Sequence, residues 1–479
     1  MSDNLRAGTR GASTIIVFQA ARILVQLASI PLLARLLEPE AFGLIAMVAV
    51  AISLGDLLRD MGISTASLKA RELTHQQASN LFWINGTLGA LGAVLLAAAT
   101  PLLVRLYDEP LLGAVVPVLA LVLLFNGFQV QLKVQLARAN RYVAIGAIET
   151  GAQGAALVVA VVAALAGASY WALVGQLMTN SLVLLVACLI ATRWRPVAPR
   201  RGVQTRPLVT DGLRIGVSNF LTYIANYAPT AIIGVRYSSA QVGFYERAYQ
   251  LVVVPLQSIL TPLNHVVVPT LSRERDDRGR LFDILVQVQL LIGFAGVLLY
   301  GVAAGTAPAL VPFVLGDSWS ESVPVLAILA TGGAFTVLAF VNFWAFLAYD
   351  RERTLMRFAL VTKPLSVLLV LVGSAQGIEG AAVGYAVGEF LSWPIGLLWL
   401  RYDLRLPVSK LVRGGALIVA LFAVAAGSAR FVVTGTAHWP HVLSLIVATL
   451  TAAALNGAIV AALPHTRRRL IATVALLRR

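Results

Sequence analysis

Apolar runs of about 20 residues recur along the whole chain, with short polar connections between them. A helix of that length crosses the hydrocarbon core of a bilayer, and the runs lack the strict alternation of barrel strands. The pattern therefore predicts an all-α polytopic membrane protein with about fourteen transmembrane helices. The expected spans are 12–34, 42–62, 81–104, 112–132, 143–166, 170–192, 211–235, 242–269, 282–308, 322–347, 354–374, 378–400, 411–429 and 441–463.

Lysine and arginine residues gather in alternate connections between the expected spans. The richest connection, TRWRPVAPRRGVQTRP, lies between the sixth and seventh spans, whereas the intervening connections hold isolated arginines such as Arg105 and Arg236. Because cytoplasmic loops carry the excess of positive charge, this alternation predicts that both termini are cytoplasmic. The first span is too long for a typical signal-peptide core and no clear cleavage site follows it, so we expect it to be retained.

The composition agrees with a membrane protein. Of the 479 residues, 58% are hydrophobic and 12% are charged, and the mean hydropathy is +0.83. A soluble chain of this size needs more polar surface. The net charge of +15 then reflects cytoplasmic loops, so no nucleic-acid partner is expected. The single cysteine, Cys188, excludes an internal disulfide and a cysteine-based metal site. With no nucleotide motif or metal-ligand spacing either, we expect no catalytic residue, metal or cofactor.

The chain reads as two related halves joined by the basic connection. LLEPEAFGLI after the first span matches RYSSAQVGFY after the seventh, which aligns Gly43 with Gly243. AGASYWALVG and AQGIEGAAVG similarly align Gly167 with Gly377. Internal repeats of this kind are typical of transporters. The expected parts are an N-terminal six-helix bundle at 1–192, a cytoplasmic linker at 193–210, a related C-terminal bundle at 211–400, and two further helices with a basic tail at 401–479.

The region Leu36–Gly89 resembles the N-terminal signature of bacterial polysaccharide exporters of the Wzx type, in the WzxC-like subgroup. The resemblance is carried by the Pro-Glu turn and following glycine of LLEPEAFGLI, by DMG, and by SNLFWIN, and it continues through GFYERAYQL. It implies membership of the multidrug/oligosaccharidyl-lipid/polysaccharide exporter superfamily. It also implies a flippase of the bacterial inner membrane that moves undecaprenyl-diphosphate-linked oligosaccharide to the outer leaflet by alternating access, for exopolysaccharide, capsule or O-antigen synthesis.

The partners that the resemblance implies are the lipid-linked oligosaccharide, the lipid bilayer, and a polysaccharide polymerase with its co-polymerase. Two other transporters of the superfamily stay open as alternatives: a lipid II flippase and a drug/cation antiporter. A membrane-embedded polysaccharide polymerase or glycosyltransferase is a more distant alternative, because the outer loops are short and poor in histidine.

The proposed cargo itself sets chemical requirements. Sugar hydroxyls cannot cross hydrocarbon unpaired, and a diphosphate suits arginine or lysine. Two spans carry a polar stripe at helical spacing: Gln19, Arg22 and Gln26 in the first, and Asn219, Tyr223 and Asn226 in the seventh. These stripes either line a polar lumen or bond neighbouring helices.

Charges also end the second span, in AISLGDLLRDMG. We expect Asp56 at about the same depth as Arg22 on the preceding antiparallel helix, since each residue adds about 1.5 Å. The hypothesis is that Asp56 holds Arg22 for the diphosphate, while Arg59 and Asp60 lie near the inner interface, where Arg59 can snorkel to water. The alternative is an ion pair that only locks the two spans together.

Four further charges lie inside expected spans, where ionisable residues are functional candidates by default. Arg247 and Lys363 are candidates for substrate binding, although Arg247 can also pair locally with Glu246. Glu149 and Glu389 are candidates for coupling to a proton or Na⁺ gradient, with pairing between helices as the other interpretation.

Overall fold

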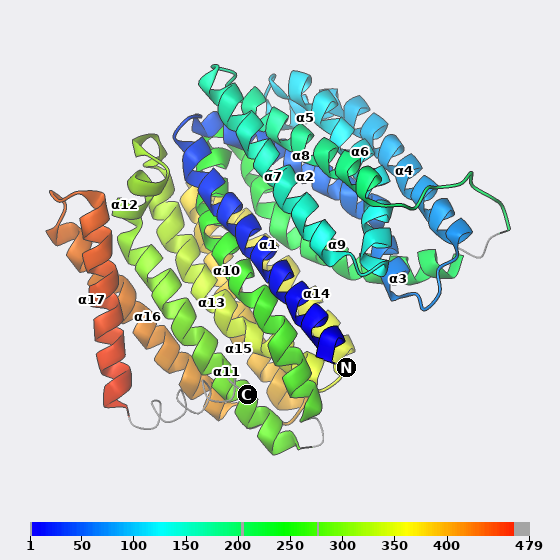
Figure 1. Cartoon of the computed structure of the whole chain (residues 1–479). Helices are drawn as coiled ribbons and strands as arrows, with labels where there is room; N and C mark the ends of the chain where they lie inside the picture. The colour runs from blue at the N-terminus through cyan, green and yellow to red at the C-terminus, as the bar shows by residue number, and fades with distance from the viewer. Residues whose placement is uncertain (1, 203–205, 275–276, 464–479) are drawn as a thin grey trace. The chain divides into compact units, whose positions relative to one another are not determined.

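The computed structural model describes residues 2–202, 206–274 and 277–463, and Figure 1 shows that helices dominate throughout. Within these ranges no strand occurs, so the all-α prediction is confirmed. The contacts divide the chain into two compact units, Met1–Gly243 and Phe244–Arg479, called here unit 1 and unit 2. Each unit is described by itself.

Unit 1 is a bundle of long helices with two short ones. Its helices are α1 (Ser2–Ala34), α2 (Pro39–Asp60), α3 (Ile63–Lys69), α4 (His75–Ala98), α5 (Thr100–Tyr107), α6 (Leu112–Arg138), α7 (Tyr142–Leu165), α8 (Trp171–Ala191), α9 (Arg206–Arg236) and the start of α10 (Ser239–Arg273). The helix α6 packs against α4 and α8, and α7 packs against α1 and α8. The core therefore centres on α6, whose Leu112, Leu119 and Leu132 have no exposed surface.

Unit 2 contains the remaining helices. They are the rest of α10, α11 (Arg278–Gly296), a π-helix (Val297–Gly301), α12 (Val302–Val314), a short 3₁₀ turn (Asp317–Trp319), α13 (Ser322–Ala348), α14 (Glu352–Gly373), a second 3₁₀ turn (Ser374–Gln376), α15 (Gly377–Asp403), α16 (Ser409–Gly435) and α17 (His441–Ala462). The helix α15 packs against α13 and α14, while α16 packs against α12 and α17. Small buried residues, such as Ala425 and Ala429, let α16 approach its neighbours closely.

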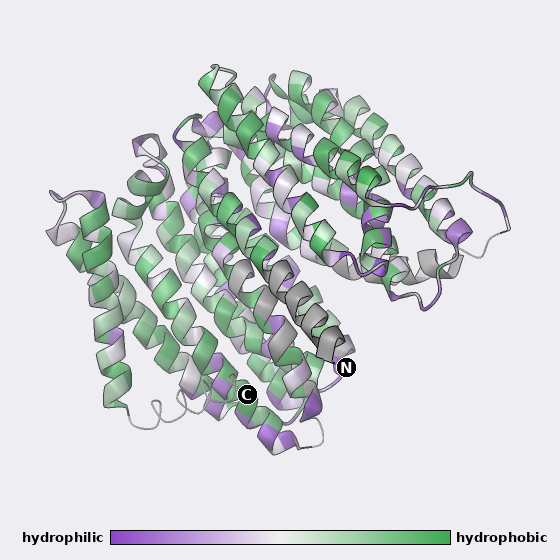
Figure 2. Cartoon of the chain, viewed as in Figure 1, coloured by the Kyte–Doolittle hydropathy of each residue, from purple (hydrophilic) through white to green (hydrophobic). Residues whose placement is uncertain are grey.

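Eleven segments of the described residues are long and apolar enough to span a membrane. One of them, Arg353–Asp403, contains α14 and α15, which the sequence pattern predicts as two spans. Figure 2 shows apolar residues along most helices and polar residues near many helix ends and connections. Many large apolar side chains are exposed on the helices, as expected for contact with lipid. The chain is a multi-pass membrane protein, and the number fourteen stays a prediction.

Two helix boundaries differ from the expected spans for local reasons. The third span was expected at 81–104, but α4 begins at His75 because Thr74 forms a capping box with Gln77. It ends at Ala98, where Pro101 lies in the first turn of α5. The helix α6 continues to Arg138 rather than ending near residue 132. That extension places Lys133 inside a helix instead of in a connection.

The compact units do not follow the predicted linker. The sequence pattern assigned the seventh span to the second half, but its helix, α9, packs against α2 and α3 in unit 1. The boundary between the units therefore falls after Gly243 rather than at 193–210. The four-part division based on repeats and the linker stays a prediction about sequence relationships.

The basic connection after α8 is an ordered strap along α4. Val197 donates its backbone N–H to Ser79 Oγ (3.1 Å), and its carbonyl accepts from Trp83 Nε1 (2.9 Å). The Asn80 side chain forms a pair of bonds with the backbone of Arg200, at 2.8 and 3.1 Å. Three residues of the SNLFWIN motif thus hold the connection by its backbone.

The two glycine pairs aligned by sequence share local geometry. A Cβ built on Gly43 would lie 1.6 Å from Ser239 O, and one built on Gly243 would lie 2.1 Å from Pro39 O. Gly43 on α2 therefore faces a carbonyl one turn before Gly243, and Gly243 on α10 faces a carbonyl one turn before Gly43. The first turns of α2 and α10 thus cross in close contact at these two glycines. Gly167 and Gly377 both have positive φ, at 80° and 92°. These likenesses agree with an internal repeat.

Candidate functional site

The second apolar segment is a broken helix. Met61 and Gly62 both have left-handed backbone conformations, with φ of 37° and 76°, and they separate α2 from α3. Asp60 then caps the first turn of α3, because its carboxylate accepts from Ser64 N (3.3 Å) and Ser64 Oγ (2.8 Å). Asp60 therefore pairs one of the backbone N–H groups that have no helical partner at the start of α3.

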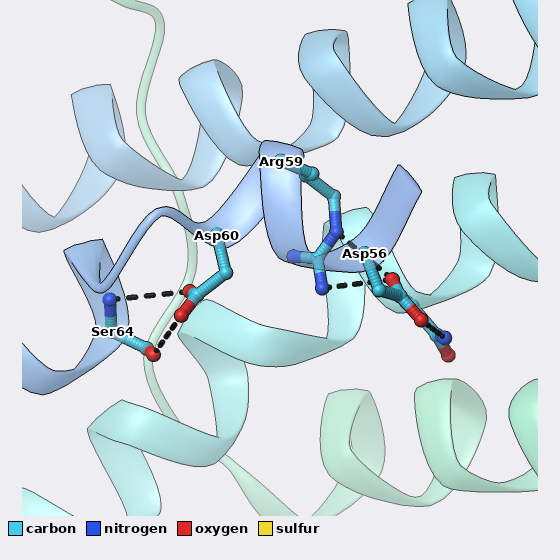
Figure 3. A network of polar contacts seen from close by, with 5 residues as sticks. Asp56, Arg59, Asp60 and Ser64 are labelled. Atoms are coloured by element: carbon cyan, nitrogen blue, oxygen red, sulfur yellow. Dashed lines mark hydrogen bonds and ion pairs between the residues drawn. The ribbon is translucent and has the colours of Figure 1, made fainter. Parts of the chain in front are cut away.

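A polar network lies one turn before the break (Figure 3). Arg59 donates through Nε and Nη2 to Asp56 Oδ1, at 3.2 and 3.0 Å. Asn126 of α6 donates to the other oxygen, Asp56 Oδ2, at 2.8 Å. Figure 3 shows Asp60 and Ser64 bonded to each other beside this network. The carboxylate of Asp56 is therefore held from two helices, α2 and α6.

Arg59 lies deeper in the unit than the sequence predicted. Its side chain is only 8% exposed, and a Cβ on Gly89 would lie 3.4 Å from Arg59 Cδ. Gly89 is about 21 Å along α4 from His75, at 1.5 Å per residue. The expectation that Arg59 snorkels to water is wrong, because its side chain turns into the unit and bonds Asp56.

A second charged cluster joins three helices of unit 1. Arg22 on α1 donates through Nη1 to Glu149 Oε2 on α7, at 2.9 Å, and Lys133 on α6 forms an ion pair with Glu149 Oε1. The carboxylate is 20% exposed, whereas the side chains of Arg22 and Lys133 are 38% and 43% exposed. Two accessible cations therefore share one more buried carboxylate, and one positive charge is left over.

The predicted pairing of Arg22 with Asp56 is wrong. Arg22 bonds Glu149, and Asp56 bonds Arg59 and Asn126. The prediction assumed that consecutive antiparallel helices pair, but α1 packs against α7. Thr150 Oγ1 also donates to Phe18 O, at 3.2 Å, which fixes that helix pair.

Sequence reasoning missed two residues of these clusters, Asn126 and Lys133. Together with Gln129 they follow i, i+3 and i+7 on α6, which places them on one helix face. The same spacing identified the stripe on α1. Lys133 directly follows the expected end of the fourth span at residue 132, a position that predicts a connection and not a helix.

The remaining candidates in unit 1 form no further charged cluster among the described side chains. Gln19 and Gln26 on α1 and Asn226 on α9 are exposed. Tyr223 donates its hydroxyl to Val50 O at 2.7 Å, so it bonds α9 to α2. The side chain of Asn219 lies outside the described residues.

In unit 2 the structure brings together two of the candidates. Lys363 Nζ on α14 lies 4.0 Å from Glu389 Oε1 on α15, and Thr336 on α13 donates to Glu389 Oε2 at 3.0 Å. Glu389 is therefore held between three helices. On α10, Arg247 donates to Gln250, which in turn donates to Glu246, so these contacts stay within one helix.

The Arg22–Glu149–Lys133 cluster of unit 1 contains two cations and one carboxylate. The guanidinium of Arg22 and the ammonium of Lys133 are partly exposed and meet at Glu149, and such groups bind phosphate oxygens strongly. No group of three or more His, Cys, Asp or Glu side chains is arranged for a metal ion in the described part of the chain.

Comparison with known families identifies the chain. A family model described as a polysaccharide biosynthesis protein matches residues 32–324, more than half of the sequence. The chain belongs to this family. The match begins in α1, after Arg22, and ends in α13, so it contains the Asp56–Arg59–Asn126 network together with Lys133 and Glu149.

Curated relatives agree with the family resemblance read from the sequence. The lipopolysaccharide biosynthesis protein WzxC of Escherichia coli K12 is 25% identical over 316 residues, covering 64% of this chain and 63% of its own length. The succinoglycan biosynthesis transport protein ExoT of Rhizobium meliloti is 24% identical over 333 residues, covering 68% and 66%. The matches therefore span just under two thirds of these relatives.

Solved structures share the fold. The lipid II flippase MurJ in an inward closed conformation has a TM-score of 0.72 at 12% identity, covering 92% of this chain and 98% of its own. An inward-facing multidrug transporter of the MATE family has a TM-score of 0.63 at 15% identity, covering 84% and 99%. At these identities the likeness concerns the fold alone.

Proposed function

We propose that the protein is a flippase for undecaprenyl-diphosphate-linked oligosaccharide in surface polysaccharide synthesis. The observation that carries the proposal is the Arg22–Glu149–Lys133 cluster. It offers two accessible cations at one place in unit 1, in a chain whose family is named for polysaccharide biosynthesis. A diphosphate needs at least two such donors to leave water.

Glu149 has a positioning role in this proposal. Without it, two like charges on α1 and α6 would repel each other at short range. With it, both cations are held together before the cargo arrives. The diphosphate then competes with one carboxylate for two cations, and it can offer several oxygens to the planar fork of Arg22. Glu149 therefore keeps the site assembled when it is empty.

Coupling to an ion gradient is part of the proposal, with Glu389 as the preferred carboxylate. Glu149 already has two cationic partners, whereas Glu389 has a hydroxyl partner and a lysine at 4.0 Å. A proton or Na⁺ at Glu389 would compete with Lys363. The prediction is that collapse of the coupling gradient stops export, and that Glu389→Gln loses this dependence.

Topology and partners are proposed on the same basis. We place both termini in the cytoplasm, because the arginine-rich connections alternate with poor ones. The C-terminal part of this assignment falls on residues 464–479, outside the described residues. A polysaccharide polymerase and co-polymerase are the proposed protein partners, since a translocated unit must next be joined to others.

The test is a deletion strain complemented with variants. Deletion should abolish surface polysaccharide and let lipid-linked oligosaccharide accumulate on the inner leaflet. Lys133→Ala should restore little export, while Lys410→Ala should restore it fully. Lys410 is a matched control because it forms an exposed ion pair with Asp283 in unit 2 and is similarly accessible, at 47%.

Other outcomes would favour the alternatives. Intact surface polysaccharide with accumulated lipid II would indicate a lipid II flippase. Altered drug resistance alone would indicate an antiporter. Sugar transfer by the purified protein would indicate an enzyme, and each of these results would overturn the proposal.

A further inference from the structure

An apolar groove runs along unit 1 between α2 and α4. It has a volume of about 350 Å³, and its lining includes Leu103 of α5 and Leu123 of α6. The lining residues are Ala51, Leu54, Gly55, Leu58, Arg59, Leu88, Leu91, Gly92, Leu95, Leu96, Ala99, Leu103 and Leu123. Several of the leucines are about half exposed, including Leu91 and Leu95. A groove of this composition fits hydrocarbon.

Arg59 is the one charged residue that lines the described groove. The α2 residues of the lining follow i, i+3, i+4, i+7 and i+8, which is one face of the helix, and Arg59 ends that series. Its guanidinium also reaches Asp56, which belongs to the polar network. Arg59 therefore connects the groove to that network.

The guanidinium of Arg59 has an unused donor. Nε and Nη2 bond Asp56, whereas Nη1 is inaccessible and has no hydrogen-bond partner among the described atoms. A buried donor without an acceptor is costly, and buried polar groups are usually paired. A ligand acceptor at this end of the groove would satisfy Nη1.

The position of Arg59 inside unit 1 bears on the kind of lipid. Its side chain packs beside Gly89, about 21 Å along α4 from His75. A resident phospholipid keeps its phosphate at the membrane surface, whereas a lipid whose headgroup is crossing the membrane carries its phosphate along the bundle.

The two charged clusters are suitably spaced for such a passage. Asn126, which bonds Asp56, and Lys133, which bonds Glu149, are seven residues apart on α6. That spacing is two helical turns on the same face, or about 10 Å. A phosphate leaving Lys133 and moving along α6 would next meet the Asp56–Arg59–Asn126 network.

We propose that the groove holds the hydrocarbon chain of the polyprenyl carrier during transport, with Arg59 Nη1 donating to the carrier's phosphate. The inference rests on the proposed function and adds to it a place for the lipid part of the cargo. The occupant is a polyprenyl chain with a phosphate end, because hydrocarbon fits the lining and a phosphate oxygen fits the unused donor.

The experiment measures binding of two probes to the full chain in detergent, farnesyl diphosphate and inorganic diphosphate. Gly92→Trp should fill the groove, since a Cβ at Gly92 meets Leu123 at an ordinary 3.5 Å. We expect Gly92→Trp to weaken the binding of farnesyl diphosphate at least about tenfold and to leave the binding of inorganic diphosphate unchanged. Gly151→Trp is the matched control, because nothing lies within 4 Å of a Cβ there. Leu91→Trp is a second filling variant should Gly92→Trp not fold.

Equal binding of farnesyl diphosphate by Gly92→Trp, Leu91→Trp and wild type would overturn the groove proposal and leave the proposed function standing. Displacement of the farnesyl probe by phosphatidylglycerol as readily as by unlabelled probe would identify an ordinary lipid groove, and would also overturn it. Failure of the proposed function looks different: wild type would bind neither diphosphate, and Lys133→Ala would change nothing.

Discussion

Replacing Gly43 with alanine tests the crossing of α2 and α10 in unit 1. The new Cβ would stand 1.6 Å from Ser239 O, an atom of the backbone that no rotamer change can remove. Real Cβ contacts stay beyond 3.0 Å, so the helices must separate by about 1.4 Å, which a close-packed interior resists.

Two opposing effects set the magnitude. Overpacking of this kind costs about 1–3 kcal/mol. Alanine gains up to about 1 kcal/mol over glycine in a helix interior, and less near the helix start, where Gly43 lies. The clash therefore wins, and we expect Gly43→Ala to destabilise the protein by about 1–2 kcal/mol.

The assay is thermal unfolding of the purified protein in detergent, followed by intrinsic tryptophan fluorescence. Gly151→Ala is the control, since its Cβ meets nothing within 4 Å and should be neutral or stabilising. Gly243→Ala should cost about as much as Gly43→Ala, because its Cβ would lie 2.1 Å from Pro39 O.

The double variant carries the sharpest expectation. Once one alanine has separated the helices, the second alanine meets less resistance. The double variant should therefore be destabilised by less than the sum of the two single variants. A Gly43→Ala protein that unfolds at or above the wild-type temperature would refute the reasoning. Strict additivity of the two variants would show that the glycines do not face each other.

Three further predictions concern local structure and chemistry. Asn80→Ala loses both bonds to the Arg200 backbone, worth about 0.5–1.5 kcal/mol each, so trypsin should cleave the strap faster; an unchanged rate would mean that the strap is held elsewhere. Met61→Gly removes a non-glycine residue from φ 37° and should raise stability by about 1 kcal/mol, measured as an unfolding temperature. Glu149→Gln removes the negative charge that holds Arg22 and Lys133 together, so the affinity of the protein for inorganic diphosphate should change. If the cluster is only structural, the variant should change the unfolding temperature and leave this affinity as it is.

The helices could be predicted from the sequence because each apolar run must satisfy its own backbone hydrogen bonds in lipid. The first alignment of glycines was also informative, since Gly43 and Gly243 occupy reciprocal places. The second span was expected to end at residue 62, where the structure has the break, but the short helix α3 that follows Gly62 was not predicted.

The partners of the charges could not be predicted. A helical wheel gives the face and the depth of Arg22, but it does not give the helix that packs there. Helix packing in membranes depends on small residues and shape, and α1 packs against α7, which is distant in sequence. The shared helix face of Asn126, Gln129 and Lys133 on α6 could have been predicted from their spacing in the sequence. The contact of Lys133 with Glu149 could be seen only in the fold.

Transport by the purified protein tests the central claim most directly. Wild type, Lys133→Ala, Arg22→Lys and Lys410→Ala would be placed in liposomes that contain a labelled polyprenyl-diphosphate-linked oligosaccharide, and the arrival of sugar at the opposite leaflet would be followed by an impermeant reagent. The account predicts rapid transfer by wild type and Lys410→Ala, and at least about tenfold slower transfer by Lys133→Ala and Arg22→Lys, since each loses charge-assisted bonds of about 1.5–3 kcal/mol. Equal rates in all four proteins, or no transfer by wild type, would contradict it.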